Sequence, residues 1–446
     1  MKTVKTSGWG RTSWSSAVIL ESDQLTIANF ENRSAKFICR GLGRSYGDSS
    51  LNEGGFQVIV NTNKFIQLDE NTGIVHLSAN TTIGELEEVS LKAGFFPPVV
   101  PGTRFVTLGG AVASDIHGKS HHIRGSISDN LLSFKLIDHN LESKLVYPEG
   151  LTSELFRATV GGMGLTGIIL SITIQLIKID SAYVNIVNAR VKDLSELIAT
   201  LIAFDKKYEY TVAWIDVSGS FIGRGIVSGA NHTPKSELSK RQVKSSVLAL
   251  KTFFSVPSWN KINFVNKYTV RVFNEFWYRK PLQNGLVSIL KFLHPLDFIG
   301  HWNRIYGEAG IIEWQFSIPL DASEFIEEAL LELKKISACS FLGVIKTFSN
   351  SSSSYLSFTQ PGISLSVDIP CNTKGLLEVL DRLDEKLTRI GGRIYLTKDS
   401  RLSRSNFQKM YPGLERWLTV KENIDPDSFW SSDQSVRLGL TGDQIL

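Results

Sequence analysis

Three glycine-rich loops constrain this chain more than any other feature of its sequence. They are residues 40–48 (RGLGRSYGD), residues 101–122 (PGTRFVTLGGAVASDIHGKSHH) and residues 161–167 (GGMGLTG). Glycine is needed where the backbone takes positive φ angles or comes into contact with a ligand. Apolar runs typical of strands lie beside these loops, for example residues 58–60 and 168–170. Together the loops predict the binding of one long phosphate-bearing cofactor.

The first loop differs from the dinucleotide-binding fingerprint. In that fingerprint a G-x-G-x-x-G loop opens a helix, whereas here residues 48–55 (DSSLNEGG) would break a helix at once. We therefore expect the loop to hold a pyrophosphate through backbone amides, with no helix N-terminus behind it. A tight strand–turn–strand explains a single glycine loop equally well. A nicotinamide dehydrogenase is disfavoured, because no strand–GxGxxG–helix unit is present.

Length and composition set further bounds. The chain of 446 residues is longer than a domain with a single hydrophobic core usually is, so two domains are expected. A net charge of +4 is too small for a dedicated nucleic-acid binder. Cys39, Cys339 and Cys371 show no CxxC spacing, which argues against a metal site and a disulfide scaffold. Because neither a signal peptide nor a long apolar run is seen, we expect a cytoplasmic protein, or one bound peripherally to the inner membrane face.

The N-terminal part reads as short strands with one well-marked helix. Thr82 and Glu85 form a capping-box pattern that opens a helix ending near Gly94. Residues 167–178 form a nearly continuous apolar run, typical of a strand buried on both faces. Residues 1–30, rich in Gly, Ser and Thr, are expected to be an irregular arm. The other strands expected here are residues 36–39, 55–61, 73–78 and 131–138.

Beyond residue 180 the glycine loops stop, and strands alternate with amphipathic helices. Residues 211–217 and 311–318 read as strands. Residues 194–203, 321–336 and 374–390 read as helices. This order predicts an α+β domain in which helices cover an antiparallel sheet.

Residues 231–300 interleave basic and aromatic side chains, among them Phe253, Trp259, Lys261 and Lys267. One interpretation is a solvated loop and helix pair whose aromatic rings lie in the core. The other is a mobile lid or a membrane-surface contact, because basic and aromatic side chains together favour anionic headgroups. The sequence leaves both open.

Residues 393–416 combine Tyr, Lys, Arg and Asp beside an expected strand at 393–396. Side chains at such strand ends often act in catalysis. A basic surface segment explains the same composition equally well.

Seven motifs spread over the chain carry a family resemblance. They are GWGR (8–11), RGLGRSYGD (40–48), PGTRFVTLGGAVASDIHGKSHH (101–122), ELFRATVGGMGLTGII (154–169), FWYRK (276–280), HPLDFIGHWNRIYGEAG (294–310) and RIYLTKDSR (393–401). Together they resemble the FAD-dependent oxidoreductases of the vanillyl-alcohol oxidase superfamily, whose FAD-binding domain is of the PCMH type. Within it they resemble the decaprenylphosphoryl-β-D-ribose 2-oxidase family.

The resemblance implies an α+β fold in two parts. A PCMH-type two-lobed FAD-binding domain would comprise residues 1–180 and be completed by residues 393–446. Residues 181–392 would form the substrate-binding domain, with an antiparallel sheet covered by helices and a mobile segment at about 231–300. The implied reaction is FAD-dependent oxidation of the 2-hydroxyl of a polyprenyl-phosphate-linked ribose to the 2-keto sugar. It is the first half of an epimerisation to the arabinose form used for cell-wall polysaccharide.

The resemblance also assigns the cofactor-binding residues, with the FAD pyrophosphate in the first glycine loop. Many relatives with covalently bound flavin carry a His at the position of Arg44. Arg cannot form that bond, so we expect non-covalent FAD. The residues assigned to the cofactor are Arg40, Gly41, Leu42, Gly43, Arg44, Ser45, Tyr46, Gly47, Asp48, Gly102, Thr107, Leu108, Gly109, Gly110, Ser114, Asp115, Ile116, His117, Ile169 and Tyr395.

Oxidation of a secondary alcohol needs a polar group that takes the hydroxyl proton while hydride leaves the carbon. Lys398 is the residue we choose, either to stabilise negative charge on the reduced flavin or to accept the proton. Tyr395 is expected against the flavin ring and His117 to orient ring or substrate, although a lone His near glycines is often only structural. The substrate-binding residues that the resemblance implies are Tyr46, Lys119, Gln315, Lys346 and Ser366.

Two points leave the substrate open. The mycobacterial enzyme of this family carries a Cys beside the substrate where this chain has Ser366. The Lys-, Ile- and Asn-rich composition is unlike that of high-GC actinobacteria, so the lipid carrier is not specified. The expected partners are a polyprenyl-phosphate sugar, a short-chain reductase acting on the keto product and a quinone-type electron acceptor, with no nucleic acid. The alternatives are a soluble aldonolactone or alditol oxidase of the same superfamily and a flavin-free binding protein.

Overall fold

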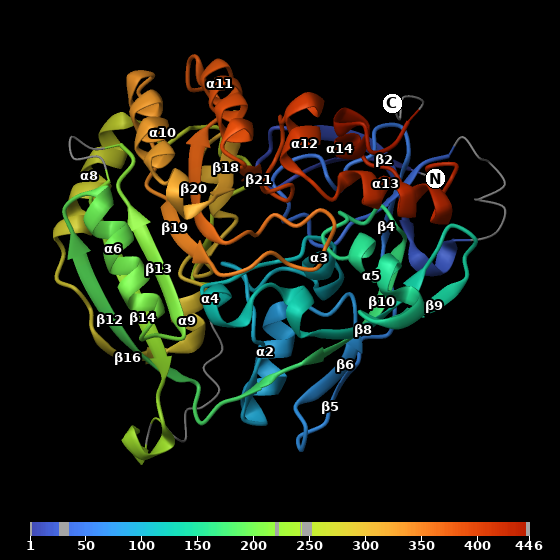
Figure 1. The fold of residues 1–446 in the computed structure, drawn as a ribbon, viewed down its shortest axis with the longest axis horizontal. Coiled ribbons are helices and arrows are strands. Elements are labelled where there is room, and N and C mark those ends of the chain that lie inside the picture. The colour runs from blue at the N-terminus through green and yellow to red at the C-terminus, as the bar shows by residue number, and fades with distance from the viewer. Residues whose placement is uncertain (1, 26–34, 219–222, 241, 243–251, 443–446) are drawn as a thin grey trace.

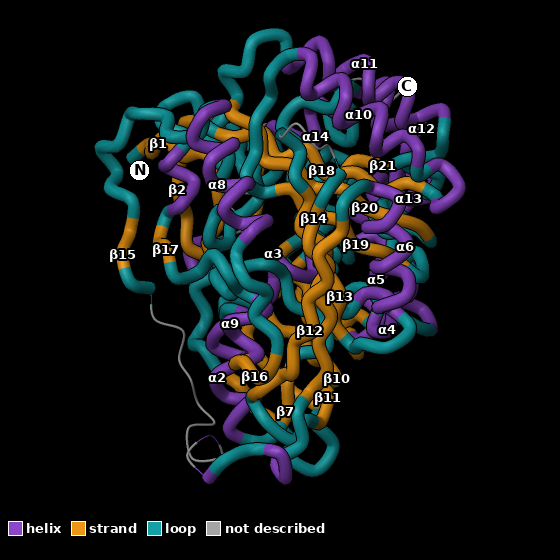
Figure 2. The backbone as a smooth tube through the Cα atoms, turned by 90° about the vertical axis from the view of Figure 1, so that its left-hand side faces the viewer, coloured by secondary structure: helices purple, strands orange, loops and turns teal. Residues whose placement is uncertain are grey.

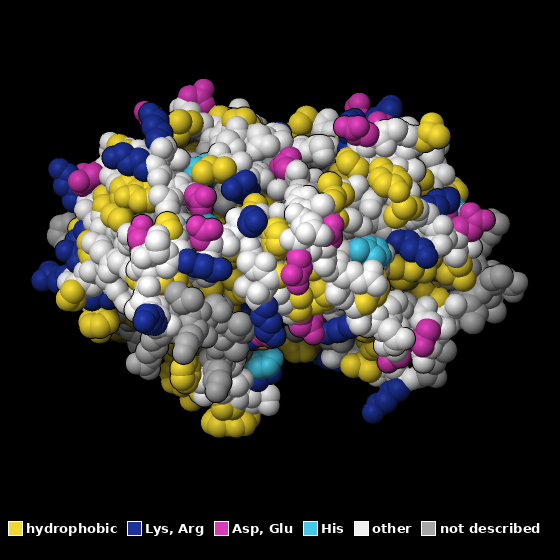
Figure 3. Space-filling view, turned by 90° about the horizontal axis from the view of Figure 1, so that it is seen from below, with side chains coloured by type: hydrophobic (Ala, Val, Ile, Leu, Met, Phe, Trp, Pro, Cys, Tyr) yellow, Lys and Arg dark blue, Asp and Glu magenta, His cyan; other side chains and the backbone are white. Residues whose placement is uncertain are grey.

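The computed structural model describes residues 2–25, 35–218, 223–240, 242 and 252–442. These residues form two lobes that lie side by side in Figure 1, with both chain ends on the right-hand lobe. Seen from below, the outline of the molecule is notched between the two lobes (Figure 3). The right-hand lobe holds a four-stranded and a five-stranded sheet together with the C-terminal helices, and the left-hand lobe holds an eight-stranded sheet.

The four-stranded sheet contains two strands that the sequence did not predict. Its strands, in spatial order, are β1 (Thr3–Ser7), β2 (Trp14–Glu21), β4 (Phe56–Ile59) and β3 (Phe37–Cys39). Because β2 pairs with both β1 and β4, the expectation of an irregular arm over residues 1–30 is wrong for these strands. Ser15 and Ala17 fill buried positions of β2, and such small residues hide the alternation by which a strand is recognised.

The five-stranded sheet supports the second glycine-rich stretch. Its strands, in spatial order, are β5 (Ile66–Leu68), β6 (Ile74–Ser78), β10 (Ile168–Gln175), β8 (Leu131–Ile137) and β9 (Ser143–Val146). Helix α2 (Ile83–Lys92) begins where the capping box predicts. The Thr82 hydroxyl accepts a hydrogen bond from the Glu85 amide, and the Glu85 carboxylate accepts one from the Thr82 amide. The apolar run at 167–178 breaks after β10, and β11 (Ile177–Lys178) pairs with β7 (Phe95–Phe96).

The left-hand lobe is one antiparallel sheet covered by helices, as the sequence predicts. Its strands, in spatial order, are β16 (Gly285–Ser288), β12 (Tyr183–Val191), β14 (Gly225–His232), β13 (Tyr210–Ile215), β19 (Gly343–Phe348), β20 (Gly362–Pro370), β18 (Ile311–Ile318) and β21 (Arg393–Ile394). The covering helices are α6 (Leu194–Asp205), α10 (Glu324–Lys335) and α11 (Leu376–Arg389). Helix α6 lies along β13 and β14 (Figures 1 and 2). The α+β arrangement is confirmed.

Strands β18 and β20 have two different buried faces. Every residue of β18 is buried, yet Trp314 and Phe316 belong to the apolar cluster formed with the helices, whereas Glu313 and Gln315 do not. Successive side chains of a strand point to opposite faces of the sheet. Directly paired residues of antiparallel neighbours share a face, and Glu313 pairs with Asp368. The face away from the helices is therefore polar: Glu313, Gln315 and Ser317 on β18, and Ser364, Ser366 and Asp368 on β20.

The chain returns to the right-hand lobe after β21. The C-terminal helices are α12 (Arg404–Met410), α13 (Leu414–Ile424) and α14 (Asp433–Leu438). Buried Trp417 donates from Nε1 to the carbonyl oxygen of Ala158 at 2.9 Å, and buried Lys421 donates to that of Leu165 at 2.6 Å. The C-terminal tail thus packs on the N-terminal part in space, while the domain limits at residues 180 and 393 stay a prediction.

The segment 231–300 contains several short elements, and its residues 241 and 243–251 lie outside the described residues. The elements are β15 (Phe254–Ser255), α8 (Lys267–Arg279), β16, α9 (Ile289–Leu293) and β17 (Ile299–Gly300). Among the helices of the described residues, we find none with the length and hydrophobicity needed to cross a membrane.

Candidate active site and cofactor cradle

The first glycine loop presents a row of free backbone donors. It follows β3, and no helix begins behind it. The N–H groups of residues 41–45 donate to no acceptor within the part of the chain that the structure describes. Gly43 takes a left-handed conformation with a φ of 63°. Successive free amides in a turn form a concave anion-binding site, so this loop fits a pyrophosphate.

Glycines in this loop also bring three chain segments together. A Cβ on Gly47 would lie 2.0 Å from the Asp399 carbonyl oxygen, and one on Gly41 would lie 2.4 Å from the Thr107 hydroxyl oxygen. The Tyr46 amide donates to the Thr397 carbonyl oxygen at 2.9 Å. These glycines therefore serve contact between loops as well as ligand approach. Gly102 differs, because a Cβ there would meet no atom within 4 Å, which leaves open space beside the second stretch.

The second stretch forms a short helix on the five-stranded sheet. Helix α3 (Leu108–Ala113) is capped by the Thr107 side chain, and it shares an apolar cluster with Ile169 of β10. The third loop packs on α3, where the Gly161 amide donates to the Val112 carbonyl oxygen at 3.0 Å. Asp115 follows the helix in a left-handed conformation, φ 42°, and burial raises the pKa of its carboxyl to about 6. The structure thus brings the three glycine loops together.

Three predicted cofactor side chains already have protein partners. Arg437 binds Asp48 through two hydrogen bonds of 2.9 and 2.8 Å. Arg40 donates to the Ser7 carbonyl oxygen at 2.7 Å. The guanidinium of Arg44 lies 4.1 Å from the centre of the Trp9 ring. We infer that these side chains shape the loop, and that its backbone is the part free to bind a ligand.

His117 lies in an aromatic enclosure beside Tyr395. Its ring centre is 5.0–5.5 Å from those of Phe348, Phe358 and Tyr395, and the Tyr395 hydroxyl donates to the Ser114 carbonyl oxygen at 2.8 Å. Burial, with the nearby Lys346, lowers the pKa of His117 well below its usual value, so the imidazole is neutral.

The hydrogen bonds of His117 leave one ring nitrogen free. Its Nε2 lies 3.1 Å from the amide nitrogen of Gln315. That nitrogen is a donor, so His117 accepts at Nε2 and carries its proton on Nδ1. Nδ1 is buried and has no partner among the described residues. A buried donor without a partner is costly, so it is available to a bound ligand.

Lys398 is held by a carboxylate that our sequence analysis missed. Its Nζ lies 2.7 Å from Glu313 Oε2 and 4.0 Å from the centre of the Tyr46 ring. The Ser366 hydroxyl donates to Glu313 Oε1 at 2.5 Å. Burial acts to raise the pKa of Glu313, but the charge and hydrogen bond of Lys398 outweigh it and hold that pKa below its ordinary value. Glu313 and Lys398 thus form an ion pair in which the carboxylate is buried and the lysine partly buried.

A second carboxyl, also missed, lies beside this pair. Asp368 is directly opposite Glu313 on the polar sheet face, and its Oδ2 has no hydrogen-bond partner within the described residues. Burial and the neighbouring Glu313 charge raise the pKa of Asp368 well above its ordinary value. Two close carboxyls cannot both ionise in a buried site, so Glu313 carries the charge and Asp368 the proton. The sequence feature that could have revealed Glu313 is that it is the single acid within the largely apolar strand 311–318 (IIEWQFSI).

Two further lysines gather positive charge near His117. Lys119 donates to the Phe292 carbonyl oxygen and lies 4.2 Å from the centre of the Phe292 ring. Burial and the nearby Lys346 lower the pKa of Lys119 to about 7. Burial and Lys398 lower the pKa of Lys346 to about 8, and Lys346 forms no ion pair within the described residues. These two lysines fit a bound anion.

Comparison with known proteins identifies the family. The sequence matches the FAD binding domain model over residues 22–142. It is 36% identical to decaprenylphosphoryl-beta-D-ribose oxidase of Mycolicibacterium smegmatis, over 98% of both chains. The chain belongs to the decaprenylphosphoryl-β-D-ribose oxidase family. A weaker similarity of 22%, over 90% of this chain and 89% of the relative, links it to L-gulonolactone oxidase of Bos taurus.

Membership of the decaprenylphosphoryl-β-D-ribose oxidase family makes the chain an FAD-dependent oxidoreductase with a PCMH-type domain, so the predicted fold class, cofactor and enzyme class are confirmed. The residues fit FAD: residues 41–45 offer free amides, Gly102 leaves space, and His117 offers an unpartnered Nδ1. The individual site residues stay predictions. The structure brings Tyr46, Ser366 and Lys398 together at Glu313 and places Gln315 and Tyr395 at His117, whereas Ile169 lies in the core beneath α3.

We predict that the FAD is not covalently attached. Arg44, at the position where covalent relatives carry a His, is packed on Trp9 and offers no nucleophile for the flavin. Acid precipitation of the purified protein should therefore release all yellow colour into the supernatant, measured as flavin absorbance. A yellow pellet would contradict the prediction.

We predict that Lys398→Met destabilises the protein by leaving Glu313 as an unpaired buried carboxylate. Removing one partner of a buried ion pair costs about 3–5 kcal/mol. The double variant with Glu313→Gln removes both charges and should recover at least about 1 kcal/mol of that loss. Denaturant unfolding of the FAD-loaded variants measures the difference, and a double variant no more stable than Lys398→Met would contradict the ion-pair account.

The stability lost in Lys398→Met should depend on pH, because Lys398 lowers the pKa of Glu313 in the wild type. In the wild type the depressed pKa of Glu313 stabilises the fold above the ordinary carboxyl range, and this contribution is lost on acidification. In Lys398→Met the hydrogen bonds from Ser366 and Tyr46 remain, but burial, the largest influence on the pKa of Glu313, is no longer offset by the Lys398 charge. We therefore expect that pKa to rise, so that protonation on acidification relieves the folded state. The stability gap between wild type and Lys398→Met should therefore narrow as pH falls from about 8 to about 5.

Proposed function

We propose that the enzyme oxidises the 2-hydroxyl of a polyprenyl-phosphate-linked ribose to the 2-keto sugar, using FAD. The observation that carries this proposal is the Lys398–Glu313 ion pair, which lies over Tyr46 at the loop proposed to hold the cofactor. The name of the Mycolicibacterium smegmatis relative, an oxidase of decaprenylphosphoryl-β-D-ribose, supports the same substrate class.

Substrate binding is assigned to the cationic groups near His117. Lys119 and Lys346 are partly buried, with pKa values lowered to about 7 and about 8, and a phosphate would bind their charged forms through charge-assisted hydrogen bonds. Gln315 and Ser366 lie on the same polar sheet face and can hydrogen-bond sugar hydroxyls. We infer that the phosphate lies at the lysines and the ribose over the polar face of β18 and β20.

Proton transfer is assigned to the Lys398–Glu313 pair. FAD, when bound, supplies the acceptor for the hydride that leaves the sugar carbon. The Lys398 ammonium stabilises negative charge that develops on the sugar oxygen. Its hydrogen bond to Glu313 Oε2, 2.7 Å long, offers the hydroxyl proton a route through Nζ to the carboxylate. At the end of the step the proton lies on Glu313 and the lysine remains charged.

The partner enzyme and the electron acceptor that we propose follow from the chemistry of the product and of the reduced flavin. A 2-keto sugar must be reduced from the other face to give the arabinose form, so we propose a short-chain reductase as the next enzyme. A reduced flavin must be reoxidised, and a quinone-type acceptor suits a lipid-linked substrate. Both partners, and a position at the inner membrane face, belong to the proposal.

We predict that Lys398→Ala retains FAD but loses turnover. Under anaerobic conditions, synthetic polyprenylphosphoryl ribose should bleach the wild-type flavin near 450 nm, and the variant should bleach at least about 10²-fold more slowly. Lys409→Ala, which changes an exposed lysine on α12, is the matched control and should bleach like the wild type. Wild-type rates in Lys398→Ala would remove Lys398 from the mechanism.

The alternative is a soluble aldonolactone or alditol oxidase. The similarity to L-gulonolactone oxidase, 22% against 36%, makes it the weaker candidate. Peroxide formation with a water-soluble sugar lactone, without flavin bleaching by the polyprenyl substrate, would favour it.

We predict that the KM for the phosphorylated substrate rises with pH. Lys119 and Lys346, with pKa values of about 7 and about 8, lose their charges between about pH 6 and 9 and with them the attraction for phosphate. The same sugar without its phosphate serves as the control and should show a much flatter profile. A KM that does not change over this range would contradict the assignment of the phosphate to these lysines.

A further inference from the structure

The segment from residue 253 to residue 280 exposes an unusual number of aromatic side chains. Phe253 is 81% exposed, Trp259 77% and Tyr268 71%. Among the described residues, every Phe that counts as exposed lies between 253 and 298. Large apolar patches on a surface mark a binding face. We call the exposed side chains of residues 253–280 the aromatic–basic surface; its large apolar members are Phe253, Phe254, Trp259, Ile262, Phe264, Tyr268, Val272, Phe273 and Phe276.

Helix α8 carries part of this surface as a regular stripe. Tyr268, Val272 and Phe276 follow one another at intervals of four residues, which places them on one face of the helix, and all three are exposed. Val270 and Asn274, on another face, are buried. The apolar stripe therefore exists in addition to the face by which α8 packs on the protein.

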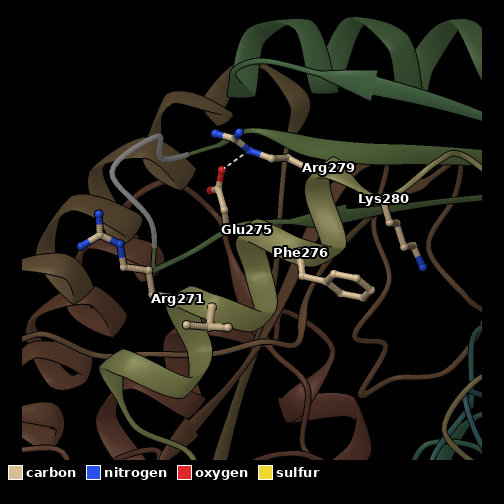
Figure 4. A pocket seen from close by; sticks show the side chains of 6 residues that line it. Arg271, Glu275, Phe276, Arg279 and Lys280 are labelled. Carbon is tan, nitrogen blue, oxygen red and sulfur yellow. Dashed lines mark hydrogen bonds and ion pairs between the residues drawn. The ribbon is translucent and has the colours of Figure 1, made fainter.

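Positive charge accompanies the aromatic side chains. Residues 253–280 contain Lys261, Lys267, Arg271, Arg279 and Lys280 against the single acid Glu275, a net charge of +4 that equals that of the whole chain. Figure 4 shows Arg271 apart from the Glu275–Arg279 ion pair, and Lys280 beside Phe276. These residues line a groove of about 560 Å³.

The aromatic–basic surface is joined to the active site by a short run of rings. The ring centre of exposed Phe273 lies 5.5 Å from that of Phe341, which lies 6.0 Å from that of buried Tyr306. Tyr306 and Tyr46 belong to one buried apolar cluster, and Lys398 lies over Tyr46. Within the described residues this cluster therefore connects the surface to the Lys398–Glu313 pair.

We propose that the aromatic–basic surface docks on an anionic lipid bilayer. Aromatic side chains enter the headgroup region, and flanking Lys and Arg attract anionic lipids. A protein partner fits less well, because Lys is depleted from the centre of protein interfaces. The purpose of docking rests on the proposed function: the polyprenyl tail stays in the membrane while the sugar phosphate reaches the site behind Tyr46.

Vesicle flotation with the FAD-loaded full chain tests the proposal. Wild type should float with vesicles of phosphatidylcholine and phosphatidylglycerol and bind much less to phosphatidylcholine alone. The variant Trp259→Ser/Phe276→Ser and the variant Lys267→Glu/Arg271→Glu should each lose about tenfold or more in partitioning. The matched control Leu151→Ser removes an exposed leucine of the other lobe and should float like the wild type.

Flavin bleaching by the surface variants distinguishes a loss of membrane docking from a loss of catalysis. With a short-chain substrate in detergent, both surface variants should bleach their flavin at the wild-type rate, and with a long-chain substrate in vesicles they should be slower. The proposal would be overturned if the surface variants floated like the wild type, or if the wild type did not float. If the surface bound a reductase and not vesicles, it would be a protein interface instead. If the wild type floated but polyprenylphosphoryl ribose did not bleach its flavin, membrane docking would be upheld and the proposed substrate rejected.

Discussion

The alternation of side chains along β18 and β20 is the constraint on which the site depends. One face of these strands is apolar and is held by α10 and α11. The opposite face must then carry the intervening residues, Glu313 and Gln315 on one strand and Ser366 and Asp368 on the other. A slip of one residue in register would exchange the two faces. The packing of the helices therefore fixes the position of Glu313, which holds Lys398, and of Asp368 beside it.

The charges of this buried site follow from that placement. Lys398 pairs with one ionised carboxylate, Glu313, and Lys346 lies near both, with Lys119 near Lys346. Asp368 and His117 remain neutral because burial and their charged neighbours shift each pKa away from the charged form. The site thus carries more positive than negative charge before any ligand binds. An anionic ligand such as a sugar phosphate restores the balance, which links the fold to the proposed substrate.

Much of this could be predicted from the sequence, and the failures have physical reasons. The capped helix after Thr82 and the amphipathic helices over the large sheet were readable because their patterns are local. Glu313 was missed because its partner Lys398 lies 85 residues away along the chain. Asp368 was missed because Glu313, the residue directly opposite it, is also distant in the sequence. The glycine loops were located, but Gly41 and Gly47 serve loop contacts as well as ligand approach, a role that a single sequence does not reveal. Strand β1 was missed because none of its residues is buried, and strand β2 because the small residues Ser15 and Ala17 fill two of its buried positions.

The central claim is that hydride leaves C2 of a ribose held over the polar sheet face, next to Lys398. Substrate deuterated at C2, and the same substrate deuterated at C3, can be mixed anaerobically with the enzyme in single turnover. The account predicts that deuterium at C2 slows the bleaching of the flavin, whereas deuterium at C3 leaves the rate unchanged. Slowing by C3 deuterium alone, or by neither label, would contradict it.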